Sequence, residues 1–345
     1  MNKSVSFLFI GLICLLISCT NEKQSLSFPE TENLYVTREL DTENIFMRYP
    51  FRIRLIDSIL YVMDLHAYEY CCHKFYYPSM KYKQSFIKRG QGPGEFTYPD
   101  NIRLAWDSTC WILDANNARL TCFRNDNPDS LMKEIRLDKR LIRTLDFDFY
   151  NDSMFIVPDY TGIYRFSILN PDGTIKENRG QIPLRGKKNK KIPDIAYAQA
   201  WRGFISYNEN NGLLAIATQL GNVLEIYDIR GDSLVNVIYG EEGEPDFFVH
   251  SGGAIPNGIM GYTDVYNGDK YIYAIFCNRT FKEIRTRTQQ IEGGNNIYVF
   301  DHYGNPVKHY ILDRYITGFY VDEKNNVIFG LDVNSDYPIV EYSLQ

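Results

Sequence analysis

The stretch Ser108-Thr-Cys-Trp-Ile-Leu-Asp-Ala-Asn-Asn-Ala-Arg-Leu-Thr-Cys-Phe123 contains two short apolar, aromatic segments separated by a turn of Asn and Ala. Ile, Leu, Trp and Phe suit strands, and Asn adopts the left-handed backbone conformations that tight turns need. The same unit returns in Ser58–Phe75, Asp152–Ile168, Asn211–Tyr227, Asp269–Phe300 and Asn326–Tyr342. One such hairpin cannot bury its own apolar faces, whereas a ring of them can.

The copies begin about 45 to 60 residues apart, which is the spacing of propeller blades rather than of helical solenoids. Aromatic residues make up 15 % of the chain and favour strands, and the lack of a long amphipathic helical run disfavours a βαβ architecture. We therefore predict an all-β fold, a six-bladed β-propeller in one domain. The predicted blades are Tyr49–Lys88, Asn101–Leu137, Ile142–Arg179, Trp201–Tyr239, Ile259–Leu312 and Ile316–Leu344.

The last predicted blade has only three strands, the third ending at Leu344. An unpaired strand edge invites aggregation, so we expect another segment to cover it. Leu34-Tyr-Val-Thr-Arg-Glu-Leu40 lies ahead of the first blade and has the composition of a strand. We predict that this segment supplies the outer strand of the last blade and closes the ring.

The amino end has the layout of a secretory signal, with Lys3 ahead of the apolar run Val5–Ile17. That run is too short to span a bilayer comfortably. Its ending, Leu16-Ile-Ser-Cys19, resembles the lipobox of bacterial lipoproteins, in which the cysteine carries the lipid. We expect residues 1–18 to be a lipoprotein signal peptide and Cys19 to be lipidated. The alternative is an ordinary signal peptide in which the cysteine is a coincidence.

The polar residues 19–32 are predicted to form a flexible tether, and residues 33–345 the propeller. The lipid would anchor the protein to a membrane of the bacterial cell envelope, the outer membrane, on its periplasmic or its surface-facing side. The net charge of −6 offers no electrostatic reason to bind nucleic acid. We expect a monomer that needs no cofactor.

Five cysteines follow Cys19, and they form no CxxC pair, which disfavours a structural zinc site. Cys110 and Cys122 each lie six residues from Asn116, so a hairpin turn at Asn116 would place them opposite each other on neighbouring strands. Two interpretations stay open: a disulfide in an oxidising envelope, or two small buried apolar side chains. Because five is odd, at least one thiol stays free.

Two basic segments interrupt the blade pattern. Arg185–Lys191 either grips an anionic glycan, phosphate or lipid headgroup, or is a solvated loop. Asn278–Asn295 enlarges the central hairpin of the fifth blade; insertions on a rigid scaffold often carry recognition, but many have no function. The cationic residues of this insertion are Arg279, Lys282, Arg285 and Arg287.

A second pattern surrounds the opening stretch. The glycine-rich connection Gly90-Gln-Gly-Pro-Gly-Glu-Phe96 precedes a strand that ends in Asp114, and Asn117, Arg119 and the aromatic Phe123 follow. This order resembles an NHL repeat. With its lipobox, the whole chain is similar to the TolB-like six-bladed propeller family of bacterial lipoproteins. The resemblance implies a propeller that serves as a binding platform, and it implies little about catalytic activity.

The glycines of this connection have two interpretations; they are Gly90, Gly92 and Gly94. A phosphate-binding loop opens into a helix whose amino end holds the anion, whereas here a Phe, a Pro and a strand follow. A tight crossover between blades explains the glycines better, because glycine adopts backbone angles that other residues avoid. We expect Asp114, Asn117 and Arg119 to fasten the blade through hydrogen bonds and a charge pair, without a catalytic role.

The sequence contains no HxH or HExxH arrangement for a metal and no GxSxG elbow for a serine hydrolase. The acid pairs Glu241–Glu242 and Asp146/Asp148 have the residue types of a general acid and base. Their loop and strand contexts favour solvated surface instead. We therefore assign no catalytic residue and no metal ligand.

If a ligand site exists, the central funnel is its default location, because six inner strands converge there. Residues at the starts of the inner strands, and in the loops before them, are expected to enter the funnel. They are Tyr49, Arg52, Asp100, Arg103, Arg143, Arg202 and Tyr262. These side chains either bind a carboxylated sugar or peptide, or plug the channel.

Three functions fit these observations. The leading hypothesis is a lipid-anchored, extracytoplasmic module that binds a protein, peptide or glycan ligand. The second is a propeller-type glycan lyase or hydrolase with its chemistry in the funnel. The third is a structural component of an envelope complex that uses blade edges and loops.

Overall fold

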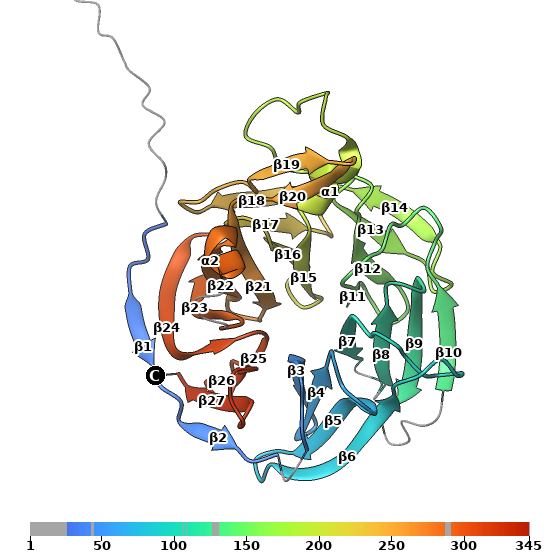
Figure 1. Ribbon diagram of the computed structural model, residues 1–345, viewed down its shortest axis with the longest axis vertical. Helices are drawn as coiled ribbons and strands as arrows, with labels where there is room; N and C mark the ends of the chain where they lie inside the picture. The colour runs from blue at the N-terminus through green and yellow to red at the C-terminus, as the bar shows by residue number, and fades with distance from the viewer. Residues whose placement is uncertain are drawn as a thin grey trace, which may run out of the picture.

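The computed structural model describes residues 26–344 except 43–44, 106, 108, 126–130 and 287–290. Six sheets surround a central axis like the blades of a propeller (Figure 1), which confirms the predicted all-β fold. The expected signal peptide, residues 1–18, lies outside the described residues, as do Cys19 and Arg287. In the part of the chain that the structure describes, no helix has the length and apolar character needed to cross a membrane.

The first three blades are four-stranded antiparallel sheets whose inner strand comes first in the chain. Blade one consists of β3 (Pro50–Ile56), β4 (Ile59–Asp64), β5 (Tyr70–Tyr76) and β6 (Lys81–Lys88). Blade two consists of β7 (Asn101–Leu104), β8 (Thr109–Asp114), β9 (Arg119–Arg124) and β10 (Leu131–Arg136). Blade three consists of β11 (Asp148–Phe149), β12 (Phe155–Pro158), β13 (Phe166–Leu169) and β14 (Ile175–Arg179).

The last three blades follow the same order, with two strands added from the amino end. Blade four consists of β15 (Gly203–Asn208), β16 (Leu213–Thr218), β17 (Val223–Asp228) and β18 (Ser233–Tyr239). Blade five consists of β21 (Ile259–Asn267), β22 (Ile272–Thr280), β23 (Gly294–Phe300), β24 (Pro306–Ile316) and the added β1 (Thr31–Leu34). Blade six consists of β25 (Phe319–Asp322), β26 (Val327–Leu331), β27 (Ile339–Ser343) and the added β2 (Arg38–Leu40).

The core lies between neighbouring blades, and the alternation of side chains along each strand builds it. In β4, Tyr61 and Met63 pack with Ile102 of blade two. Leu60 and Val62 point to the other face of the same sheet and pack with the buried residues of blade six. Both faces of a blade are therefore buried, which explains why these strands are more apolar than a half-exposed strand.

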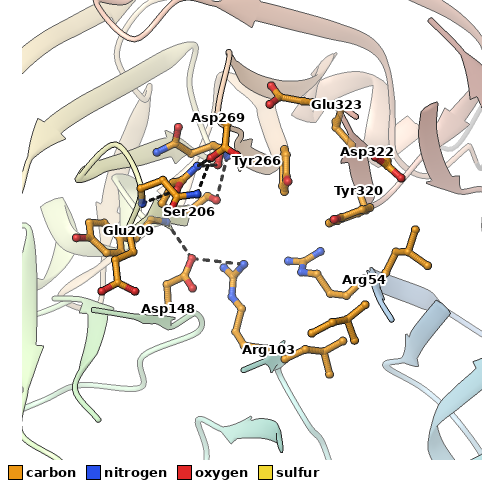
Figure 2. A pocket seen from close by; sticks show the side chains of 18 of the residues that line it. Arg54, Arg103, Asp148, Ser206, Glu209, Tyr266, Asp269, Tyr320, Asp322 and Glu323 are labelled. Atoms are coloured by element: carbon orange, nitrogen blue, oxygen red, sulfur yellow. Dashed lines mark hydrogen bonds and ion pairs between the residues drawn. The ribbon is translucent and has the colours of Figure 1, made fainter. Parts of the chain in front are cut away.

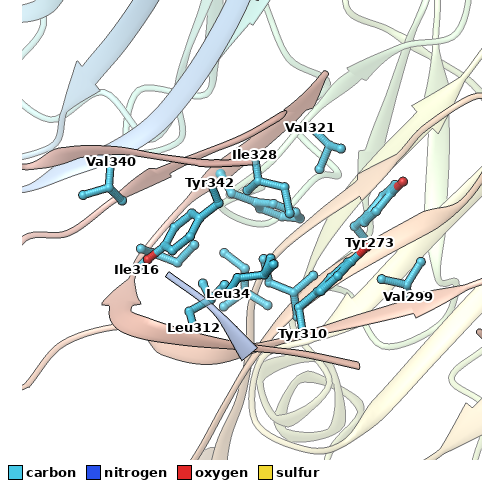
Figure 3. Packing of buried hydrophobic residues seen from close by; sticks show 13 residues of the cluster. Leu34, Tyr273, Val299, Tyr310, Leu312, Ile316, Val321, Ile328, Val340 and Tyr342 are labelled. Atoms are coloured by element: carbon cyan, nitrogen blue, oxygen red, sulfur yellow. The ribbon is translucent and has the colours of Figure 1, made fainter. Parts of the chain in front are cut away.

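The amino-terminal segment closes the ring by pairing with two blades. β2 runs antiparallel to β27, with Leu40 opposite Ile339, and completes blade six as predicted. Leu34 instead ends β1, which runs parallel to β24 with Leu34 opposite Leu312. Figure 3 shows Leu34 inserted among the buried side chains of blades five and six, including Tyr342. The segment thus fastens blade five to blade six as well as supplying the missing strand.

The residues just before β1 also pack on the ring, so the predicted tether is too long at its carboxyl end. The Phe28 ring lies 4.8 Å from the Tyr298 ring, measured between centroids. Lys308 Nζ lies 2.8 Å from Glu30 and 3.0 Å from Glu32. An aromatic residue and two acids with matching partners on blade five hold residues 26–32 against the ring, despite their polar composition.

The register of blade two rules out the proposed disulfide. Cys110 lies opposite Phe123, and Cys122 lies opposite Trp111. The turn has four residues, so its centre falls half a residue beyond Asn116. A shift of one residue sends side chains to opposite faces of a sheet. Both cysteines are buried and free, as is every cysteine among the described residues, so the second interpretation is correct.

Three elements outside the blades were not predicted: α1 (Asp194–Ala200), the hairpin of β19 (Phe247–His250) and β20 (Gly253–Pro256), and α2 (Phe281–Thr286). α1 and the hairpin share a small core, in which the rings of Tyr197 and Phe247 lie 5.7 Å apart. The basic loop 185–191 is attached beside it, because the Arg185 guanidinium lies 3.9 Å from the Tyr239 ring. α2 occupies the insertion in blade five.

Closure by the amino-terminal strands predicts a clear stability difference. Leu40 is 1 % exposed and packs in the core of blade six, so Leu40→Ala is expected to lower the free energy of unfolding by about 2–4 kcal/mol. Tyr35 lies between the two added strands and is 69 % exposed, so Tyr35→Ala is expected to change the free energy of unfolding by less than about 0.5 kcal/mol. Urea unfolding followed by tryptophan fluorescence measures both. Equal effects of the two substitutions would contradict a closing role for β2.

Candidate functional site

A cavity of about 480 Å³ opens at one mouth of the central channel. Its walls are the carboxyl ends of all six inner strands and the turns after β15, β21 and β25, as Figure 2 shows from close by. This volume is typical of sites for small ligands. The charged side chains that line it are Arg54, Arg103, Asp148, Glu209, Asp269, Asp322, Glu323 and Lys324.

Arg103 is a structural cation that ties three blades together. Its guanidinium lies 3.1 Å from Asp146 and 3.6 Å from Asp148, and its Nε donates a hydrogen bond of 2.7 Å to the Phe147 carbonyl. A further hydrogen bond of 2.7 Å reaches the Ile205 carbonyl of blade four. Burial disfavours the charge of this guanidinium, but the two carboxylates outweigh burial and raise the pKa of Arg103.

Asp146 and Asp148 are therefore buried, not solvated as expected from sequence. Asp146 is 1 % exposed and Asp148 is 8 % exposed. Asp148 begins the short inner strand β11 and Asp146 lies two residues before it, and Arg103 supplies the compensating charge. Asp146 Oδ2 also accepts a hydrogen bond of 2.9 Å from the Ile205 N–H.

Arg52 fills the middle of the channel. It is 1 % exposed, and its guanidinium lies 3.6 Å from Asp264 of blade five. The same group lies 3.8 Å from the Phe51 ring and 4.9 Å from the Phe204 ring of blade four. A side chain from blade one thus crosses the channel to blades four and five.

Arg54 differs from both of these arginines. Its Nη1 donates hydrogen bonds only to carbonyl groups, 2.7 Å to Ile53 and 3.4 Å to Phe319, and none of the described carboxylates lies within ion-pair distance. Burial, reinforced by the Arg103 guanidinium, lowers the pKa of Arg54 to about 10, so it stays charged at neutral pH. In Figure 2 its guanidinium points into the cavity beside that of Arg103.

An aromatic pair forms the wall next to Arg54. The rings of Tyr266 and Tyr320 lie 5.3 Å apart in an edge-to-face arrangement. Burial raises the pKa of both hydroxyls, so both stay neutral at physiological pH. Such a pair offers a flat apolar surface with a polar edge.

The rim of the cavity is acidic. Asp269 accepts hydrogen bonds of 2.9 Å and 3.0 Å from the side-chain amides of Asn208 and Asn210, with Asn210 the main cause of its lowered pKa. Glu323 accepts hydrogen bonds from the backbone N–H groups of Lys270 and Tyr271, at 3.0 Å and 3.1 Å. These donors are neutral, so they orient the carboxylates without cancelling their charge.

Six of the seven predicted funnel residues lie in the channel or at one of its two mouths. Arg103 lines the cavity, and Arg52 is buried in the channel, outside the cavity lining. Four further residues, none of them buried, precede inner strands and therefore lie at the opposite mouth. They are Tyr49, Asp100, Arg143 and Arg202.

Tyr262 does not reach the channel at all. It is fully buried in the core between blades four and five, where its hydroxyl donates a hydrogen bond of 2.9 Å to Asn222 Oδ1. The pairing of β21 with β22 shifts register at this residue, which turns the side chain toward the neighbouring blade.

The opposite mouth holds a looser group of side chains. Asp100 accepts a hydrogen bond of 2.8 Å from the Ala115 N–H, and burial raises its pKa to about 6. Burial also raises the pKa of Tyr49 to about 12 and lowers that of Arg202, whose Nε has no hydrogen-bond partner in the described structure. Arg143 is exposed.

Sequence reasoning missed Arg54, Tyr266, Tyr320 and the rim acids, because it placed the site at the starts of the inner strands. One signal was present. Arg52-Ile-Arg54 puts two cations at alternate positions of an inner strand, which sends both to the channel side.

The connection ahead of blade two fastens that blade. Asp114 accepts hydrogen bonds of 2.8 Å from the Asn117 side chain and 3.2 Å from Arg119 Nε. Glu95 accepts a hydrogen bond of 2.9 Å from the Gly92 N–H, and it lies so close to Gly90 that a Cβ there would collide with it. Gly94 has a φ of +73°. Within the described residues, no three His, Cys, Asp or Glu side chains gather as a metal site would require.

The different environments of two cavity arginines predict different costs of removal. Arg103→Met is expected to lower the free energy of unfolding by about 3–5 kcal/mol, because it leaves Asp146 and Asp148 buried without a counter-charge. Arg54→Met is expected to cost less than about 1 kcal/mol, because no ion pair is broken. Chemical denaturation of the two variants tests this contrast, and a large loss in Arg54→Met would make Arg54 a structural residue.

Solved structures resemble this fold closely in architecture and weakly in sequence. A member of the duf4221 family from Bacteroides vulgatus aligns with a TM-score of 0.58 at 11 % identity, over 90 % of this chain and 97 % of that one. A streptogramin B lyase structure aligns with a TM-score of 0.51 at 14 % identity, over 91 % and 88 % of the two chains. The WD40 repeats of RRP9 align with a TM-score of 0.53 at 8 % identity, over 90 % of this chain and 98 % of that one. These similarities concern the fold alone.

No curated protein matches the chain significantly in sequence. The family model described as TolB-like 6-blade propeller-like matches residues 27–324, which is most of the ring. With six blades around a channel and this match, the chain belongs to the TolB-like six-bladed propeller family.

Proposed function

We propose that the protein is a lipid-anchored, extracytoplasmic binding module whose ligand presents an anionic group to Arg54 in the central cavity. The single observation that carries this proposal is the guanidinium of Arg54, which is charged, partly buried and without a carboxylate partner among the described residues. Burying a cation in this way costs free energy, and a carboxylate or phosphate of a ligand would recover it.

The other cavity groups support binding rather than proton transfer. Asp148 is held by Arg103 and by the N–H of Tyr207, at 2.9 Å. Asp269 and Glu323 are occupied by amide donors. Carboxylates held in this way position a ligand well, but they lack the freedom of movement that favours a general acid. Burial raises the pKa of Asp148, and the Arg103 guanidinium opposes that effect.

The anchored location rests on the amino-terminal sequence, and the path of the chain is compatible with it. Leu26 lines a groove with Gly304, Asn305 and Pro306, the turn that leads into β24. A lipid on Cys19 would be joined to the ring by the residues between Cys19 and Leu26, which span at most about 25 Å when extended. The ring would then stay close to the membrane surface.

The ligand hypothesis is tested by the charge of Arg54. A panel of probes that includes galacturonate, trialanine and inorganic phosphate is screened by thermal shift, and hits are measured by calorimetry. Arg54→Gln is expected to weaken binding of any hit at least about tenfold, since a charge-assisted hydrogen bond contributes about 1.5–3 kcal/mol. Lys324→Gln removes one positive charge from the same lining and is the control. Binding that survives Arg54→Gln unchanged contradicts the proposal.

The anchor is tested separately. Cys19→Ser is expected to move the protein from the membrane fraction to the soluble or uncleaved pool and to abolish labelling by a palmitate analogue. Cys14→Ser changes a cysteine inside the apolar run and is the matched control. Unchanged lipid labelling of Cys19→Ser would show that the cysteine is not the attachment point.

A further inference from the structure

We infer that the ligand of the central cavity is zwitterionic, an amino acid or short peptide whose free carboxylate meets Arg54 and whose ammonium group meets the acidic rim. This inference rests on the proposed function and names the ligand class. It follows from the distribution of charge in the cavity, which has a positive group at its inner wall and negative groups around its opening (Figure 2).

The charges do not cancel within the cavity. Arg103 and Asp148 neutralise each other at 3.6 Å. Among the remaining lining residues that the structure describes, Arg54 and Lys324 are cationic, and four are acidic. The four acids are Glu209, Asp269, Asp322 and Glu323.

Most of these rim carboxylates are oriented by neutral donors only. Asp322 accepts hydrogen bonds of 2.7 Å and 3.1 Å from the side chain and the backbone N–H of Asn325. Asp269 is held by two asparagine amides, which lower its pKa and keep it ionised. Glu209 is exposed in the turn after β15, and no partner of its carboxylate is found in the described part of the chain. The rim therefore presents negative charge at fixed positions.

Two ligand classes are separated by this arrangement. A purely anionic ligand, such as a uronate or phosphate, gains at Arg54 but pays for repulsion as it passes the rim acids. A zwitterion is attracted at both ends, because its carboxylate meets Arg54 and its ammonium group meets the rim acids. The reversed orientation would place like charges together at both ends. The apolar middle of such a ligand would lie along Tyr266 and Tyr320.

The size of the cavity agrees with this class. Its volume of about 480 Å³ is in the range that encloses a small molecule and leaves no space for a folded partner. Arg54 lies on the inner strand β3, and the rim acids lie at the end of an inner strand or in the short turn after one, so the ring of blades places both charged ends of the cavity.

Blocked peptides test the inference. Binding of trialanine, N-acetyl-trialanine and trialanine amide is measured by calorimetry at low ionic strength with the full mature chain. Both blocked forms are expected to bind at least tenfold more weakly than trialanine. If N-acetyl-trialanine or galacturonate binds as tightly as trialanine in an Arg54-dependent manner, the zwitterion inference fails and the anion-binding function stands. If no probe binds, both fail.

A charge reversal at the rim gives a second readout that does not depend on folding of buried groups. Glu209→Lys is expected to weaken trialanine at least fivefold and to leave N-acetyl-trialanine unchanged or tighter. Asp152→Lys makes the same change of charge in an exposed turn of the same face, outside the cavity lining, and is the control. Equal effects of the two substitutions would show that the rim acids act only through the net charge of this face, and they would overturn the inference.

Discussion

Burial of both faces of every blade is the constraint on which the structure depends. Leu60 and Val62 are buried against blade six, while Tyr61 and Met63 are buried against blade two. The other blades are packed between their neighbours in the same way. No blade is stable with a free face, so the chain must close on itself. The amino-terminal segment does this with two short strands that together span the seam between blades five and six, where Leu34 and Leu40 are almost fully buried.

Closure creates a channel that apolar side chains alone do not fill. The inner strands converge on the axis, and long charged side chains cross it from one blade to another. Arg52 reaches Asp264, and Arg103 reaches Asp146, so each buried guanidinium meets a carboxylate from a different blade. Removing one member of such a pair leaves a buried charge without a counter-charge, which strongly destabilises the fold. Arg54 alone of these three has no carboxylate partner in the described structure, and the cavity lies where it points.

Much of the fold could be predicted because blade strands leave a strong pattern: period-two alternation between Asn, Asp and Gly turns. The closing strand was predictable for a physical reason as well, since an open blade edge demands a partner. Errors arose where one residue decides the outcome. The centre of the turn lies half a residue beyond Asn116, so Cys110 and Cys122 are not opposite each other. A register shift at Tyr262 turns that side chain away from the channel. No pattern in a single sequence carries that precision.

The sequence-based prediction favoured the starts of the inner strands, whereas the cavity lies at their carboxyl ends, because sequence indicates which strands are inner but not which end of them is hollow. The polarity of the chain explains the result. The carboxyl end of each inner strand leads into a tight turn, and tight turns are built from Asp and Asn. That mouth is acidic by construction, as Asp269 and Glu323 illustrate. Arginines from strand interiors, such as Arg54, then point up into an acidic ring. A cavity with opposite charges at its two ends therefore follows from turn chemistry and strand alternation together.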